Sequence, residues 1–152
     1  MMKQFIMMAL VLPVLALGGC LEKASHSTGV SLDGGYSFAT ASMQKNGVVG
    51  GMLVNQGGED VVIVSARGDV SERIELHTHI HENGVMKMRE VKSYMVPANG
   101  SLKLGPMGEH IMLMGLKGKL ETGDQFSVTL IDDEGGTHDV SVNVRAPGDM
   151  PE

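Results

Sequence analysis

Short runs of Val, Ile, Leu and Thr, separated by turn signals, follow one another along the chain, and no long stretch has the apolar spacing of a helix. The turn signals are residue pairs that favour tight turns: Asn46-Gly47, Gly57-Gly58, Asn83-Gly84, Asn99-Gly100, Gly105-Pro106 and Gly135-Gly136. This pattern is typical of an all-β fold, either a sandwich or a barrel. We predict antiparallel strands near residues 35–42, 47–55, 60–66, 72–82, 85–91, 101–104, 109–114, 125–132 and 137–145.

The first residues, MMKQFIMMALVLPVLALGGC, have the features of an export signal: one lysine, an apolar run that is short for a membrane span, and then small residues. The end of this segment, LGGC, resembles the bacterial lipobox. The resemblance implies that residues 1–19 are a lipoprotein signal peptide and that Cys20 carries lipid. Alternatives are an ordinary cleaved signal and an uncleaved anchor. Cys20 is the only cysteine, so no internal disulfide can form. We expect a lipid-anchored protein on the periplasmic side of a bacterial membrane, or otherwise a soluble periplasmic one.

Composition divides the rest of the chain into three parts. Residues 20–33 are predicted to be a lipid-anchored linker, 34–146 the β-sandwich domain, and 147–152 a flexible tail. The formal net charge is −6, and it becomes more negative without Lys3 of the signal segment. Such a surface repels nucleic acid, so the membrane is expected as a partner only through the lipid anchor.

The segment RIELHTHIHENGVMKMREV places several histidines on one face of a strand. Successive side chains of a strand point to opposite faces, so His77, His79 and His81 share a face while Ile74, Leu76 and Ile80 line the other. Three imidazoles therefore lie on the same face of this strand.

Asn83-Gly84 is the strongest hairpin signal in the chain, and a two-residue type I′ turn there pairs Glu82 with Val85. In that register His81 lies opposite Met86 and His79 lies opposite Met88. His77 is then diagonal to Met88. Opposed or diagonal side chains are about 4.5–8 Å apart, which is close enough for their donor atoms to share an ion.

The run HIMLMGLK places His110, Met112 and Met114 at steps of two, where a core strand normally has Val, Ile or Leu. We expect His110 and Met112 to face the hairpin, with Ile111 and Leu113 in the core and His110 exposed. Thioether sulfur is soft and prefers Cu(I), and it cannot be lost to disulfide formation outside the cytoplasm. The cluster therefore indicates copper, although methionine also serves as core filler and a strand histidine is often only solvated.

The spacing of His77, Met88, His110 and Met112 matches the H-x10-M-x21-H-x-M signature of the periplasmic copper chaperones called PCuAC. The flanking segments ENGVMKMR, PANG, HIMLMGLK and ETGD are also similar, over roughly residues 70–131. The resemblance implies a cupredoxin-like antiparallel β-sandwich that binds Cu(I) through those four residues. It also implies delivery of the copper, together with Sco-type proteins, to the CuA subunit of cytochrome c oxidase.

His79 and His81 depart from the family pattern. With Met86 they are candidate additional ligands, either for Cu(II) beside the Cu(I) site or for no metal at all. The predicted register also places His79, not His77, directly across from Met88, and a bulge or a longer turn would reconcile it with the signature.

Other functions stay open beside the chaperone. The protein could sequester copper without a dedicated acceptor, or be a lipoprotein that binds no metal. A copper redox enzyme using the three-histidine face is a further alternative, but a blue-copper site needs a cysteine thiolate and none lies within the domain. The sequence contains no nucleophile set and no phosphate loop, so we expect a binding protein and not an enzyme.

Overall fold

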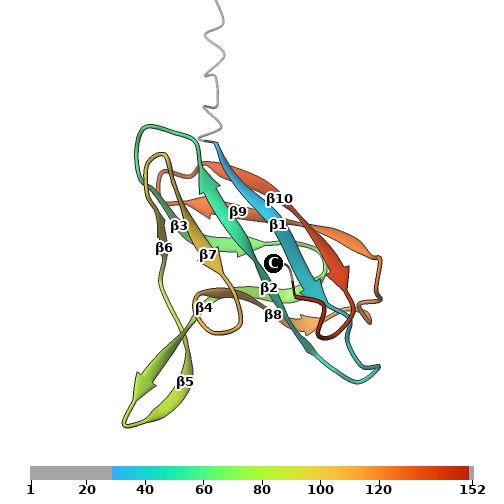
Figure 1. Cartoon of the computed structure of the whole chain (residues 1–152). Helices are drawn as coiled ribbons and strands as arrows, with labels where there is room; N and C mark the ends of the chain where they lie inside the picture. The colour runs from blue at the N-terminus through green and yellow to red at the C-terminus, as the bar shows by residue number, and fades with distance from the viewer. Residues whose placement is uncertain (1–28, 151–152) are drawn as a thin grey trace, which may run out of the picture.

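The computed structural model describes residues 29–150, and Figure 1 shows that they form strands and loops. The strands are β1 (Val30–Phe38), β2 (Asn46–Asn55), β3 (Val61–Arg67), β4 (Ser71–Glu82), β5 (Val85–Glu90), β6 (Tyr94–Val96), β7 (Gly100–Leu104), β8 (His110–Leu116), β9 (Gln125–Asp132) and β10 (Thr137–Arg145). The predicted all-β fold is confirmed. In this range no helix is long and apolar enough to cross a membrane. The predicted signal peptide and Cys20 lie outside the described residues.

The strands pair in the order β5-β4-β8-β2-β1-β10-β9-β3-β6, with β7 beside β2. All of these pairings are antiparallel except one, because β1 runs parallel to β10. The predicted antiparallel pairing thus holds for every other pair, and β1/β10 is the one departure from it. Turn signals report only on strands that are neighbours in sequence, whereas β1 and β10 come from opposite ends of the domain.

β2 changes its pairing partner along its length. Its first half pairs with β8, from Asn46 to Val49, and its second half pairs with β7, from Gly51 to Asn55. The change of partner occurs at Gly50 and Gly51. Gly51 has φ 142°, and a Cβ on Gly50 would lie 2.5 Å from the Tyr36 ring. Only glycine lets the strand turn from one partner to the other so close to that ring.

The buried core is mostly aliphatic. The fully buried side chains include Val49, Leu53, Ile63, Leu104, Ile111, Leu113, Val128, Leu130 and Val142. Alternation along the strands produces this burial, as in β10, where every second side chain points inward. Ile111 and Leu113 are buried as expected, so β8 is fixed in the core and its opposite face is available for a site.

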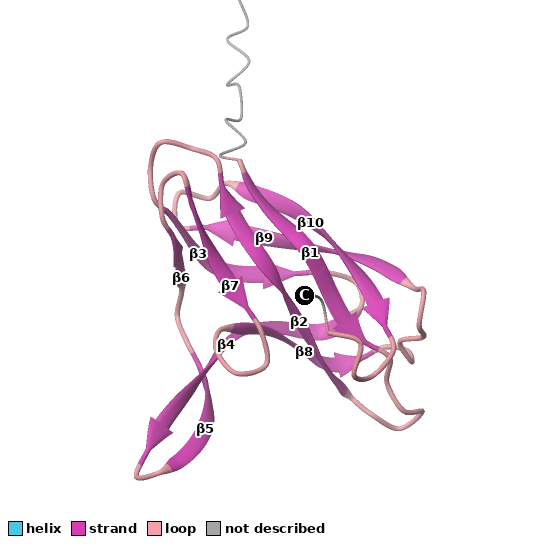
Figure 2. Ribbon diagram, viewed as in Figure 1, coloured by secondary structure: helices cyan, strands magenta, loops and turns pink. Residues whose placement is uncertain are grey.

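The hairpin of β4 and β5 projects from the body of the domain (Figures 1 and 2). β4 pairs with β8 only as far as His77, and beyond that residue it pairs with β5 alone. We call residues 78–89 the arm. Asn83 and Gly84 both have positive φ, as a type I′ turn requires, and the predicted pairing of Glu82 with Val85 is confirmed.

Several predicted boundaries need correction. β1 begins at Val30, so residues 30–33 belong to the domain and not to the linker. β6 was not predicted, because a three-residue strand is too short to show alternation. Of the predicted tail, Met150 lines a cavity together with Tyr36 and the loop from Gly105 to Gly108.

Candidate metal centre

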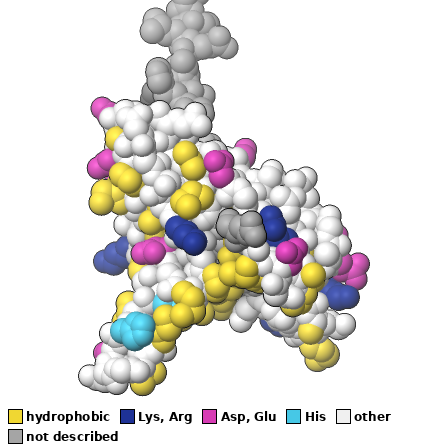
Figure 3. Space-filling view, in the orientation of Figure 1, with side chains coloured by type: hydrophobic (Ala, Val, Ile, Leu, Met, Phe, Trp, Pro, Cys, Tyr) yellow, Lys and Arg dark blue, Asp and Glu magenta, His cyan; other side chains and the backbone are white. Residues whose placement is uncertain are grey.

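Three imidazoles meet where β4, β5 and β8 come together. His77 lies opposite His110 in the β4/β8 pairing, with ring centroids 5.9 Å apart. The His79 ring is 5.0 Å from the same His110 ring. The alternation of β4 places His77 and His79 on one face, and the register of β8 brings His110 beside both. Histidine side chains are visible along the projecting arm, with apolar side chains beside them (Figure 3).

The His110 ring has a free nitrogen. Its Nδ1 lies 2.9 Å from the Gly108 carbonyl oxygen, which can only accept, so Nδ1 carries the proton. The Nε2 atom of the neutral ring then bears the lone pair, and it is buried with no hydrogen-bond partner between residues 29 and 150. Burial lowers the pKa of His110 below its usual 6.5, although the hydrogen bond to Gly108 acts to raise it. The neighbouring His79 and His77 lower this pKa further. The ring is therefore neutral at pH 7, as a metal ligand must be.

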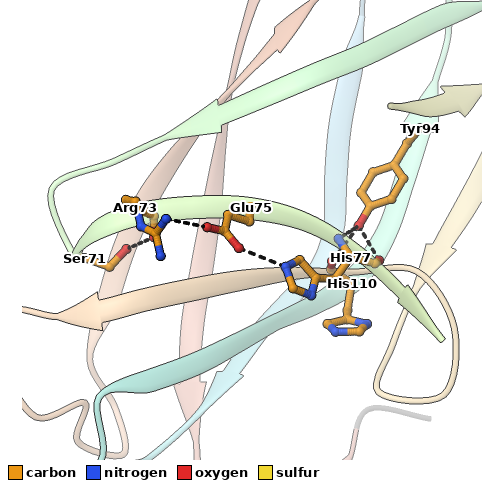
Figure 4. A network of polar contacts seen from close by, with 6 residues as sticks. All are labelled: Ser71, Arg73, Glu75, His77, Tyr94 and His110. Carbon is orange, nitrogen blue, oxygen red and sulfur yellow. Dashed lines mark hydrogen bonds and ion pairs between the residues drawn. The ribbon is translucent and has the colours of Figure 1, made fainter. Parts of the chain in front are cut away.

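His77 has the same arrangement with the nitrogens exchanged. Its Nε2 lies 3.0 Å from a carboxylate oxygen of Glu75, and the other oxygen lies 3.2 Å from Arg73 (Figure 4). Nδ1 of His77 is buried and has no hydrogen-bond partner in the described part of the chain, and the same holds for Nδ1 of His79. A histidine that donates one N–H to a carboxylate and leaves the other nitrogen free has the geometry common among metal ligands.

Tyr94 joins the two strands behind these rings. Its hydroxyl accepts the backbone N–H of His77 at 2.8 Å and donates to the carbonyl oxygens of His77 and His110 (Figure 4). Burial raises the pKa of this hydroxyl, so it stays protonated and able to donate. The tyrosine thus fixes the backbone spacing of the two histidines.

The methionines lie on both sides of the imidazoles. Met112 follows His110 on the same face of β8 and is 8 % exposed. It pairs with Glu75 of β4. Met88 lies directly opposite His79 on the arm and is 43 % exposed. Met114, farther along β8, pairs with Arg73 and lies away from the histidines.

The structure places the candidate additional ligands farther out. His81 pairs with Met86 near the tip of the arm, as predicted, and both are exposed. The register of β4 and β5 is continuous from His77 to Glu82, so the bulge or longer turn that would set His77 opposite Met88 is absent from this hairpin. His77 pairs instead with Glu90, and Met88 reaches it only on the diagonal.

Two expectations about the site change. His110 was predicted to be exposed, but it is 1 % exposed because the loop before β8 and the rings of β4 cover it. Glu75 and Tyr94 were not predicted as part of the site. Glu75 could have been found, since it shares the alternation of His77, whereas no local pattern points to Tyr94. Between residues 29 and 150, no group of three or more His, Cys, Asp or Glu side chains is arranged to hold a metal ion on its own.

Comparison with known proteins gives the family. The model of the family described as "Putative lipoprotein LpqE-like" matches residues 30–144. The chain belongs to the LpqE-like family. Among its relatives, "Putative lipoprotein Lxx21020" of Leifsonia xyli subsp. xyli is 36 % identical over 139 residues, which cover 87 % of this chain and 84 % of that protein.

Solved structures similar to this LpqE-like chain include the solution structure of CuI-DR1885 from Deinococcus radiodurans. It is 28 % identical, with a TM-score of 0.63 over 82 % of this chain and 85 % of that one. The copper-bound PCuAC domain from PmoF2 is 14 % identical, with a TM-score of 0.61 over 76 % and 92 % of the two chains. The fold of this LpqE-like protein is therefore the cupredoxin-like β fold of PCuAC domains, as the sequence resemblance implied.

Proposed function

We propose that the protein is a copper chaperone that binds Cu(I) outside the cytoplasm and delivers it to an acceptor. The observation that carries the proposal is the set of unpartnered ring nitrogens of His77, His79 and His110, beside strands that bear Met88 and Met112. The likeness to CuI-DR1885 and to a copper-bound PCuAC domain supports copper as the cargo.

The ligands that we propose are Nδ1 of His77, Nε2 of His110 and the sulfurs of Met88 and Met112. The two thioethers carry no charge, and burial keeps the pKa of His110 low, so these three donors lose no proton when they bind at pH 7. Neutral imidazole and thioether suit a soft monovalent ion better than Zn²⁺ or Ca²⁺, which favour thiolate or oxygen ligands. Glu75 would hold the His77 ring in place through the other nitrogen.

The uneven burial of these ligands supports a carrier. His110 and Met112 are buried on β8, whereas Met88 is exposed on the arm. An ion held by the two buried ligands and by Met88 would be bound firmly from the domain side. It would still be reachable from solvent through Met88. An acceptor could then take the copper by replacing the exposed ligand first.

The location and partners of the protein follow from the sequence resemblances. We propose that Cys20 is lipidated and holds the domain at the periplasmic face of a bacterial membrane. We propose a Sco-type copper protein and the CuA subunit of cytochrome c oxidase as partners. A copper-sequestering lipoprotein would have the same ligands, and would differ in failing to transfer copper to an apo acceptor.

The test is an anaerobic titration of the full chain with Cu(I) against a competing chelator, followed by X-ray absorption spectroscopy. The Cys20→Ser variant is used, because an unlipidated thiolate would itself bind Cu(I). We expect a single Cu(I) with both sulfur and nitrogen neighbours. Coordination by nitrogen and oxygen alone would contradict the proposed ligands, and the absence of competitive binding would contradict the proposed function.

A further inference from the structure

The arm carries two successive histidine–methionine pairs that lead outward from the buried histidines. His79 lies opposite Met88, and His81 lies opposite Met86. Directly opposed residues of an antiparallel pair point to the same face, so all four side chains share the face on which His77 and His110 meet. Each pair offers one imidazole nitrogen and one thioether sulfur.

The spacing of these pairs suits transfer from one to the next. The His79 ring is 5.0 Å from that of His110, so the inner pair adjoins the buried site. The outer pair is two residues farther along each strand, which is about 7 Å. Side chains directly opposed across the strands have Cβ atoms about 4.5–5.5 Å apart, so both donors of a pair can reach one ion. A change of side-chain rotamer can bridge the step between pairs.

Packing does not explain the methionines of the arm. Met86 and Met88 are 37 % and 43 % exposed, and beyond His77 the arm pairs with no other strand of the domain. Methionine as core filler needs a core to fill, and here there is none. An isolated two-stranded hairpin also gains little stability from its side chains.

Charge is segregated between the two faces of the arm. Lys87 and Arg89 alternate with the methionines and so lie on the opposite face, where both contact Glu82. The donor face carries no lysine or arginine from the arm, and Glu90 lies at its inner end, opposite His77. Arg73, farther inward on the same face of β4, is paired with Glu75. A cation on the donor face therefore meets neutral ligands and carboxylates.

We infer that the pairs His79–Met88 and His81–Met86 form an exit path, along which Cu(I) moves by ligand exchange from the buried site to the tip of the arm. The inference rests on the proposed Cu(I) chaperone function. Each step replaces one neutral donor by another at the same ion, so no electron is transferred and no covalent bond is broken. At the tip, the acceptor that fits is a protein that presents an unpaired sulfur ligand, thiolate or thioether, to the exposed His81 and Met86.

The experiment separates binding from release. The full chain with Cys20→Ser is loaded anaerobically with Cu(I), and bathocuproine disulfonate is added while its coloured Cu(I) complex is followed by stopped-flow absorbance. The test variant adds His81→Ala and Met86→Leu. The control adds Ile80→Ala and Val85→Ala, two exposed apolar positions on the opposite face of the arm.

We expect the test variant to keep the Cu(I) affinity of the unaltered arm within about twofold and to release copper at least about tenfold more slowly. The control should match the unaltered arm in both. Unchanged release in the test variant overturns the exit path and leaves the chaperone function standing. A large loss of affinity in that variant also overturns it, because the outer pair would then belong to the resting site. If the Cys20→Ser chain with an unaltered arm binds no Cu(I), the proposed function fails, and the exit path fails with it.

Discussion

The rings of His77 and His110 lie 5.9 Å apart across β4 and β8, although β5, β6 and β7 separate them in the chain. Their backbones are joined by one hydroxyl, that of Tyr94. The spacing of the two histidines is thus set by hydrogen bonds of the protein and is present before any ion binds. Such preorganisation lowers the cost of binding, since the ligands need not be brought together by the metal.

The first prediction concerns Tyr94. Tyr94→Phe removes the hydroxyl that pairs with the N–H of His77 and with the carbonyl oxygens of His77 and His110. We expect the free energy of unfolding of the copper-free protein to fall by about 1–3 kcal/mol, as measured by urea denaturation. Tyr36→Phe is the control, because the Tyr36 hydroxyl makes no hydrogen bond among the described residues, and it should change stability little. Equal losses in the two variants would show that the hydrogen bonds of the Tyr94 hydroxyl do not stabilise the fold.

The burial of His110 changes what its replacement should do. His110→Ala leaves a cavity and an unpaired Gly108 carbonyl, so we expect a loss of about 2–4 kcal/mol in copper-free stability. His110→Gln keeps more of the volume and should cost less stability, but it lacks the imidazole nitrogen. Both variants should lose at least about tenfold in Cu(I) affinity. If His110→Gln bound Cu(I) as well as the unaltered protein, Nε2 of His110 would not be a ligand.

A third prediction separates the two oxidation states of copper. Met88→Leu together with Met112→Leu removes both thioethers and nearly conserves volume, so the fold should lose less than about 1.5 kcal/mol at each site. We expect Cu(I) affinity to fall strongly, while Cu(II) binding through His77, His79 and His81 is partly retained, because imidazole suits the harder ion. Calorimetric titration with each ion measures both. Met43→Leu replaces an exposed methionine in the loop between β1 and β2 and serves as the control. Parallel losses for the two ions would mean that Met88 and Met112 serve packing alone.

Acid stability should depend on a buried pair at the turn between β9 and β10. The Asp132 carboxylate accepts hydrogen bonds from His138 at 2.9 Å and from the Gly136 N–H at 2.6 Å. Burial alone would raise the pKa of Asp132, but these bonds outweigh it and lower the pKa below the usual 3.8. A carboxyl with a lowered pKa in the folded state stabilises the fold above its unfolded pKa, and this stability is lost as pH falls from 3.8 towards the folded pKa.

Urea denaturation over a range of pH tests this prediction with Asp132→Asn. We expect the variant to be less stable than the unaltered protein near neutral pH by about 1–3 kcal/mol, with the gap closing below the pH at which unfolded aspartate is protonated. Asp133→Asn alters an exposed neighbour and should leave the pH profile unchanged. A gap that stays constant with pH would assign the loss to packing and not to ionisation.

The last prediction concerns the anchor. If Cys20 carries lipid, Cys20→Ser should move the protein from the membrane fraction to the soluble fraction of the producing bacterium. Unfolding of the domain should be unaltered, because Cys20 precedes the first strand. Membrane association that persists in this variant would count against lipidation.

The sequence was informative wherever the structure depends on neighbours in the chain. Asn83 and Gly84 specify a turn whose geometry sets the register of β4 and β5, so the pairing of His79 with Met88 could be predicted. Features that depend on residues far apart in the chain could not be predicted. Alternation shows which face His110 points to, but not that a loop and two other rings cover that face. Tyr94 lies in a strand too short to recognise, and its role depends on two carbonyls from different strands.

The separation of the arm from the core has an evolutionary consequence. Substitutions at His81, Met86 or Met88, which are exposed on the arm, should be nearly neutral for folding. His110 and Met112, by contrast, are buried in the domain, and most changes there should carry a folding penalty. Relatives with this fold are therefore free to vary the outer ligands, and with them the acceptor that each can serve, while the inner half of the site changes slowly.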